Sequence, residues 1–182
     1  MRKAIWSKVW LDSNSEELAI EFRDCVEDLL QDEMVQKLDD FIQHFSTTRL
    51  QHSINVAYHS YLICKFLGLD YRSAARAGIL HDLFLYDWRV ERQPEGRHAF
   101  AHPKVALRNA RKIAKLNPIE EDGIVKHMWP VTFALPKYLE SYIITFVDKY
   151  CAYGETMEGL IYGIAEKSMI LNCLISGGVY AK

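Results

Sequence analysis

Apolar residues recur at helical spacing along almost the whole chain of 182 residues, and its proline and glycine residues fall mostly between the periodic segments. The stretch from residue 15 to 30, for example, repeats Phe22, Val26 and Leu29 after a Ser-Asn-Ser sequence suited to a helix start. The same reasoning predicts helices at residues 32–44, 47–66, 70–82, 103–115, 118–127, 136–153 and 156–174. The periodicity therefore predicts an all-α fold, a single helical bundle.

A chain of this length fits one domain with a substantial hydrophobic core. We expect residues 1–46 to supply N-terminal helices that pack on the domain, residues 47–153 to form its core, and residues 154–182 to form a C-terminal helix of the same domain. Residues 86–102 lose the helical pattern and are rich in aromatic and arginine side chains. Such a segment in a compact domain is typical of a binding loop or a lid.

Charge and cysteine content exclude several classes of protein. The net charge of −2 gives no basic stripe for a nucleic acid polymer, so any phosphate that the chain binds should belong to a small molecule. The four cysteines form no CxxC pair, which indicates neither a zinc knuckle nor a disulfide framework. No run of about 20 apolar residues predicts a membrane span, and no signal peptide is evident at the N-terminus. We expect a soluble, cytoplasmic protein.

The chemistry of the chain is concentrated in six imidazole and carboxylate side chains, each expected on a helix or near a helix end. Such ligands suit divalent manganese, iron, zinc, cobalt or nickel. Several helices of a bundle can each point one ligand at a common centre. The six residues are His52, His81, Asp82, His102, His127 and Asp148. Because neighbouring helical residues diverge by about 100°, His81 and Asp82 can straddle a metal, and the carboxylate of Asp82 can bridge two ions.

The segments RLQHSINVA at His52, AGILHDLF at His81-Asp82 and ITFVDKY at Asp148 resemble the HD-domain metal-dependent phosphohydrolases over about residues 47–153. HAFAHPKVAL at His102 and IVKHMWP at His127 are similar to the further histidines of the binuclear members, which include symmetrical dinucleoside tetraphosphate hydrolases and the HD-GYP type.

The resemblance implies a first metal held by His52, His81, Asp82 and Asp148, and a second held by Asp82, His102 and His127. Iron or manganese is favoured for the two divalent ions, although zinc, cobalt, nickel or magnesium would also fit. The expected activity is hydrolysis of a small phosphoester or phosphoanhydride, a nucleotide by preference, by a metal-activated water. Asp82 and His81 would act in the catalytic centre, and Asp87 is the candidate general acid.

One position departs from the family pattern. Many of these enzymes carry a lysine three residues after the aspartate of the doublet, whereas this chain has Leu85. Other cations could bind the phosphate instead, because ammonium and guanidinium groups both pair with phosphate oxygens. The candidates are Arg49, Arg89, Arg97, Lys104, Lys126 and Lys149. The aromatic residues Phe84, Tyr86, Trp88 and Phe100 could stack on a base.

Three histidines fall outside the ligand set. His44 and His98 are expected at the periphery, and His59 is expected behind the ligands or in ordinary packing. Arg49, one turn before His52, could also orient a carboxylate ligand.

Two other functions are compatible with the same residues. Some HD-fold proteins, such as inositol oxygenase, use four histidines and two aspartates to hold a diiron centre that activates dioxygen, and Leu85 in place of lysine modestly favours that reading. A non-catalytic module that binds a nucleotide signal is the second alternative. The apolar C-terminal helix could serve a homodimer as well as the core.

Overall fold

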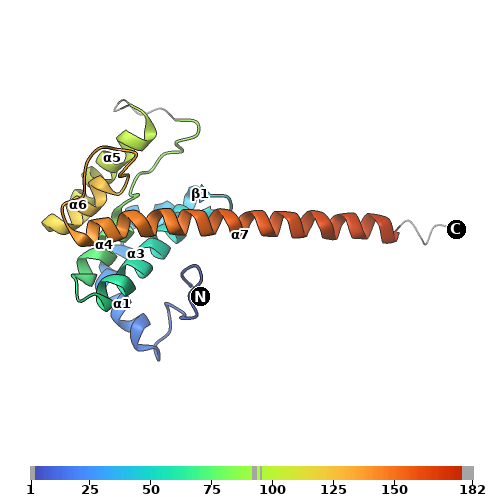
Figure 1. Cartoon of the computed structure of the whole chain (residues 1–182), viewed down its shortest axis with the longest axis horizontal. Coiled ribbons are helices and arrows are strands. Elements are labelled where there is room, and N and C mark those ends of the chain that lie inside the picture. The colour runs from blue at the N-terminus through green and yellow to red at the C-terminus, as the bar shows by residue number, and fades with distance from the viewer. Residues whose placement is uncertain (1–2, 92–93, 95, 178–182) are drawn as a thin grey trace.

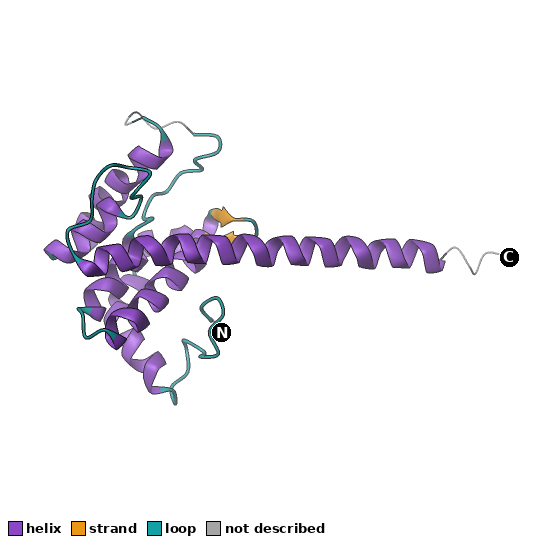
Figure 2. Cartoon of the chain, viewed as in Figure 1, coloured by secondary structure: helices purple, strands orange, loops and turns teal. Residues whose placement is uncertain are grey.

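The computed structural model describes residues 3–91, 94 and 96–177, with side chains up to residue 165. In this part of the chain about 64% of the residues are helical, in seven α-helices, with a small two-stranded sheet, and this confirms the all-α prediction (Figure 2). The elements are α1 (Glu17–Leu30), α2 (Glu33–Gln36), the 3-10 helix η1 (Lys37–Asp40), β1 (Ile42–His44), β2 (Thr47–Thr48), α3 (Arg49–Phe66), α4 (Tyr71–Leu80), α5 (His98–Ile113), α6 (Pro118–Lys126) and α7 (Leu139–Gly177).

Side-chain caps fix the starts of the three helices that lead to the site. Thr48 accepts a hydrogen bond from the amide of Gln51 at the start of α3, and Asp70 accepts one from Ser73 at the start of α4. Asn117 opens α6 with a capping box completed by Glu120. These caps lie where the sequence predicted the helix starts.

Helices α3 and α4 form the centre of the core, with α7 laid across them (Figure 1). Gly78 of α4 touches the backbone of α3, and a Cβ atom there would lie 2.5 Å from the Cα atom of Ala57. This approach brings the rings of His52 and His81 to 5.3 Å between centroids. The contact between two small residues therefore sets the spacing of two predicted ligands.

Four of the predicted helices were wrong in detail. Residues 32–44 are not one helix but α2, η1 and β1, and β1 pairs with β2 in an antiparallel hairpin. Helix α5 begins at His98 rather than Pro103, because the amides of Phe100 and Ala101 bond to the carbonyl of Arg97. The two helices expected at 136–153 and 156–174 are one helix, α7. The helix runs through Gly154, and Trp6 packs so closely on this glycine that a Cβ atom there would overlap its ring.

No helix in the described ranges is long and apolar enough to cross a membrane.

Candidate metal centre

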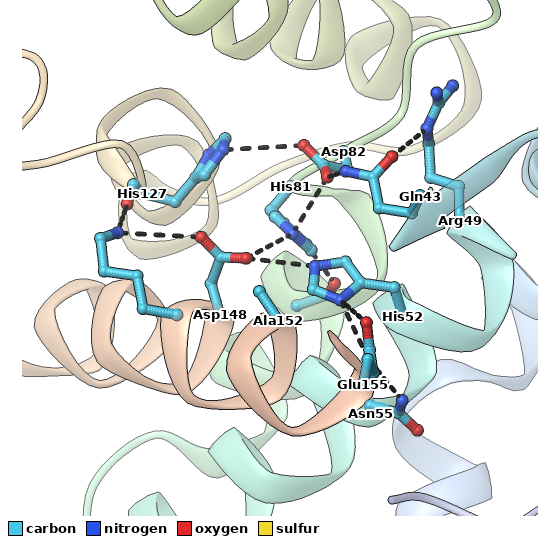
Figure 3. Close-up of polar contacts among 12 residues, drawn as sticks. Gln43, Arg49, His52, Asn55, His81, Asp82, His127, Asp148, Ala152 and Glu155 are labelled. Atoms are coloured by element: carbon cyan, nitrogen blue, oxygen red, sulfur yellow. Dashed lines mark hydrogen bonds and ion pairs between the residues drawn. The ribbon is translucent and has the colours of Figure 1, made fainter. Parts of the chain in front are cut away.

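The first group of predicted ligands comes from three helices. His52 lies on α3, His81 directly follows α4 and Asp148 lies on α7, with one ligand atom of each within 4.8 Å of the others (Figure 3). The Nε2 atom of His52 is 3.1 Å from Oδ1 of Asp148, and Nε2 of His81 is 3.7 Å from the same oxygen. The structure thus brings together residues that are almost 100 positions apart.

The second group lies beside the first. Nε2 of His102, on α5, is 3.3 Å from Oδ1 of Asp82, and Nε2 of His127, after α6, is 3.7 Å from that oxygen. The other oxygen of Asp82 is 3.6 Å from Nε2 of His81. The carboxylate of Asp82 therefore faces both groups, which is the position that a bridging ligand requires.

Hydrogen bonds fix the orientation of the histidine rings. His81, His102 and His127 each donate from Nδ1 to a backbone carbonyl three or four residues earlier, so each Nε2 atom presents a lone pair to the centre. The three acceptors are Gly78, His98 and Ile124, each at 2.8 Å.

The donors and acceptors of the site fit a bound metal. Nε2 of His81 and Oδ1 of Asp82 are buried and have no hydrogen-bond partner. Unsatisfied buried polar atoms are rare in folded proteins, and here both are acceptors that point at the same region. A cation in the first group would satisfy Nε2 of His81, and one in the second group would satisfy Oδ1 of Asp82.

Glu155 is a candidate site residue that the sequence reasoning missed. Its carboxylate accepts a hydrogen bond from Nδ1 of His52 at 3.0 Å and another from the amide of Asn55 at 2.7 Å. A carboxylate behind a histidine fixes the tautomer and makes the ring a better metal ligand. Its spacing could have pointed to it, because Glu155 lies two helical turns after Asp148 and so on the same face of the helix. It was missed because the helix was expected to end near Tyr153.

Arg49 was expected to bind substrate or to orient a carboxylate ligand, and in the structure it does not line the cavity. It is completely buried, where it donates from Nε to Gln43 at 2.9 Å and from Nη1 to the carbonyl of Phe84 at 2.6 Å. The Nε2 atom of Gln43 in turn donates to Oδ2 of Asp82 at 2.5 Å. Burial lowers the pKa of Arg49 to about 10. The residue positions Asp82 through Gln43.

The charges of the centre are strongly coupled. Burial by itself would lower the pKa of His52, but hydrogen bonds to Asp148 and Glu155 raise it to about 10. Burial would raise the pKa of Asp148, yet His52 and His81 hold it well below its usual range. The pKa of His127 falls to about 3 because it is buried beside other histidines. The two groups thus pair ionised carboxylates with imidazole nitrogens.

A cavity of about 320 Å³ opens onto both groups. Its walls combine polar groups of the centre with aromatic and apolar side chains. The lining residues are Gln43, His44, Asp82, Trp88, His98, His102, His127, Met128, Val131, Asp148, Lys149 and Ala152. His44 and His98 were expected at the periphery of the site. In the structure β1 carries His44, and the first residue of α5 is His98, and both line the cavity. His59 instead bonds to the carbonyl of Ile5 at 2.8 Å, as ordinary packing.

Lys149 is the one predicted cation on this wall among the described residues. Its Nζ atom bonds to the carbonyl of His127 at 2.9 Å and lies 3.8 Å from Oδ2 of Asp148. Burial lowers its pKa, an effect that Asp148 opposes.

The remaining predicted site residues lie outside the cavity wall. Asp87 accepts a hydrogen bond from the amide of Arg89 in an exposed turn, and its role as general acid stays a prediction. Arg89 itself bonds to the carbonyls of Ile42 and Gln43, which ties the loop to β1. Lys126 forms an ion pair with Asp122 at 2.5 Å. Arg97 and Lys104 are exposed on and beside the first turns of α5.

One of the four aromatic candidates, Trp88, lines the cavity. Its ring stacks on His98 at 5.1 Å between centroids with an interplanar angle of 15°, and His98 stacks on His102 at 4.4 Å. Phe84 and Tyr86 are buried, and Phe84 lies 3.6 Å beneath the guanidinium of Arg49. The wall therefore offers one stacking platform, made by Trp88 and His98.

Comparison with known proteins matches residues 49–153 to the HD domain family. Ribonuclease Y of Petrotoga mobilis is 37% identical over 71 residues, which are 39% of this chain and 13% of that protein. Ribonuclease Y of Clostridium kluyveri is 29% identical over 128 residues, which are 68% of this chain and 23% of that protein. The chain thus spans less than a quarter of the length of these relatives. No solved structure matches it significantly.

Proposed function

Because this chain belongs to the HD domain family, we propose that it is a metal-dependent phosphohydrolase that acts on a small phosphoester or phosphoanhydride, with nucleotides as the substrate class. The observation that carries the proposal is the position of Asp82. Its carboxylate lies between two groups of buried acceptor atoms at the wall of a cavity.

In this proposal His52, His81, Asp82 and Asp148 hold a first metal, and Asp82, His102 and His127 hold a second. When bound, two divalent ions would supply an activated water and would neutralise charge on the phosphoryl oxygens. Iron or manganese is favoured, although imidazole and carboxylate ligands accept other divalent ions as well.

Lys149 is the residue proposed to bind the phosphate. Its ammonium group reaches the cavity next to Asp148, and it would supply the positive charge that the family lysine contributes where this chain has Leu85. Gln43 would hold Asp82 in place during the reaction through the amide that Arg49 orients. Met128 and Val131 add apolar surface that limits the access of water.

The stacked rings of Trp88 and His98 support a nucleotide as the substrate, because a base has a flat face that can continue such a stack. The cavity volume lies near the lower end of the range for small-molecule sites, which favours a single nucleotide unit. The name of the two relatives makes RNA a second candidate. Binding of a nucleic acid polymer requires a row of basic side chains, however. Among the described residues, the cavity wall has one lysine.

The test is a turnover screen of the metal-loaded chain with nucleotides, phosphoanhydrides, a generic phosphodiester and a short RNA. We expect turnover of a small substrate that is lost in Asp82→Ala and retained in Asp24→Ala, a change at an exposed aspartate on α1. Lys149→Met should raise KM at least about tenfold, because it removes the cavity cation. No hydrolysis of any substrate, together with oxygen uptake, would support the oxygenase alternative instead.

A further inference from the structure

Helix α7 has two faces with different roles. Asp148, Ala152 and Glu155 lie on the face turned toward α3 and the cavity (Figure 3). The helix continues well past the rest of the fold (Figure 1). Its other face carries large apolar side chains in contact with solvent, and these have no role in the proposed chemistry.

Six of these side chains form a continuous line, which we call the apolar stripe: Phe146, Tyr150, Tyr153, Met157, Leu160 and Ile164. Successive members are separated by four and three residues in alternation. This is the spacing of the a and d positions of a coiled coil, which keeps the side chains on one face over about 27 Å of helix. The stripe therefore has the form of a helix–helix seam that lacks its second helix.

The exposed area of the stripe is large for a surface without a partner. Its side chains are between 38% and 68% exposed, and Trp6, which lies edge-on against Tyr150, is itself 48% exposed. Given the size of such side chains, the stripe presents roughly 650 Å² of accessible surface, more than a soluble monomer usually leaves in one apolar patch. Two such surfaces would together bury roughly 1,300 Å², within the range of specific protein interfaces.

The residues beside the stripe indicate which kind of protein surface would pack on it. In a coiled coil, charged residues beside the seam choose the partner. Along the stripe the flanking positions are Val147, Lys149, Gly154, Thr156, Ile161 and Gly163. Lys149 is the one charged residue among them, and its Nζ atom bonds to the carbonyl of His127 rather than standing beside the seam. A partner with charged flanks would therefore find few opposite charges there, whereas the uncharged flanks from Gly154 to Gly163 would meet no like charge on an identical stripe.

We propose that a second copy of this chain covers the stripe, with the two α7 helices packed against each other across a two-fold axis. A two-fold contact uses the same patch on both copies, so one self-complementary apolar line is sufficient. The proposal does not depend on the hydrolase activity, because the stripe lies on the face of α7 turned away from the centre.

The test is sedimentation equilibrium of the full chain over a range of concentrations. We expect a dimer for the unaltered protein and, for the double variant Leu160→Lys/Ile164→Lys, a dissociation constant raised by about a hundredfold or more, since both substitutions place a charge within the seam. Tyr162→Lys is the matched control. Tyr162 is 74% exposed on the same helix, but it lies about 200° around the axis from Leu160 and from Ile164.

The control variant should therefore remain dimeric. Circular dichroism and metal content should be unchanged in both variants, because neither change touches the core or the centre. An unaltered chain that stays monomeric at 100-fold above the usual working concentration would overturn the proposal. A double variant that dimerises like the unaltered chain, or a Tyr162→Lys variant weakened to the same extent, would overturn it too.

Discussion

The Nε2 atoms of His102 and His127 lie 2.8 Å apart, although both rings use Nδ1 to donate to backbone carbonyls. In the neutral rings each Nε2 atom carries a lone pair and no proton, so the two acceptors face each other at hydrogen-bond distance. This contact is unfavourable unless a positive charge lies close to both nitrogens. It is the local reason to assign a metal to this pair.

Replacing His127 should remove the second metal alone. We expect His127→Ala to reduce the metal content from two ions to one per chain, because His52, His81 and Asp148 form a separate group. Elemental analysis by mass spectrometry measures this content directly. His59→Ala is the control, since His59 bonds to the carbonyl of Ile5 outside the centre. Equal loss of both ions in His127→Ala would mean that the two sites do not fill independently.

Glu155→Gln should weaken metal binding without removing a ligand. A glutamine can still accept a hydrogen bond from His52, but it no longer carries the charge that makes the ring a stronger ligand, so affinity should fall about 10–100-fold. A competition titration with a chelator gives the affinity. Glu158→Gln, an exposed change three residues further along α7, should leave it unaltered. If both variants bind metal equally well, Glu155 has only a structural role.

Removal of the metal should lower the stability of the fold. A ligand that binds only the folded state at a concentration 100 times its dissociation constant contributes about 2.7 kcal/mol to the free energy of unfolding. Thermal unfolding before and after chelation, with re-addition of metal as the control, measures the difference. The same melting temperature in both states would argue against occupied sites.

Arg49→Lys should destabilise the protein by about 2–4 kcal/mol. Lysine cannot donate at once to Gln43 and to the carbonyl of Phe84 in the geometry of the guanidinium, so buried acceptors lose their partners. Urea denaturation gives the free energy of unfolding. Arg89→Lys, a change at a partly exposed arginine, should cost less than about 1 kcal/mol. Equal losses in the two variants would contradict the central position of Arg49.

Gly78→Ala should destabilise the core because a Cβ atom at this position would overlap the backbone of Ala57. Helices α3 and α4 would have to separate, and we expect a loss of about 3 kcal/mol or more together with weaker metal binding. The control is Gly163→Ala in α7, where the nearest atom, from the ring of Phe45, is 3.7 Å away. That change should be neutral or stabilising, because alanine favours helix over glycine.

Features that depend on residues close together in the chain could be predicted from the sequence, whereas features that depend on contacts between distant segments could not. The helix starts at Thr48, Asp70 and Pro118 were predictable because a cap, or a proline in the first turn, acts within one turn of the chain. The six candidate ligands were recognisable from their order, and in the structure they form two adjacent groups.

The missed features depend on contacts between distant segments. Gln43 reaches Asp82 only because residues 42–44 form a strand beside α3 rather than the end of a helix. Trp6, almost 150 positions earlier, packs directly on Gly154 inside the continuous helix α7. The neighbours of Gln43 and Gly154 in the sequence give no sign of these contacts. The same holds for Arg49, whose buried position was not evident from its neighbours.

Three of the four candidate histidine ligands are held by carbonyls of their own helical turn. Their orientation is therefore a property of secondary structure, acquired as soon as the turn forms and independent of the walls of the cavity. Such a turn can be inherited as a unit while the loop with Trp88 and the side chain at position 149 diverge. Substrate preference can then change in evolution without any retuning of the nitrogens that face the centre.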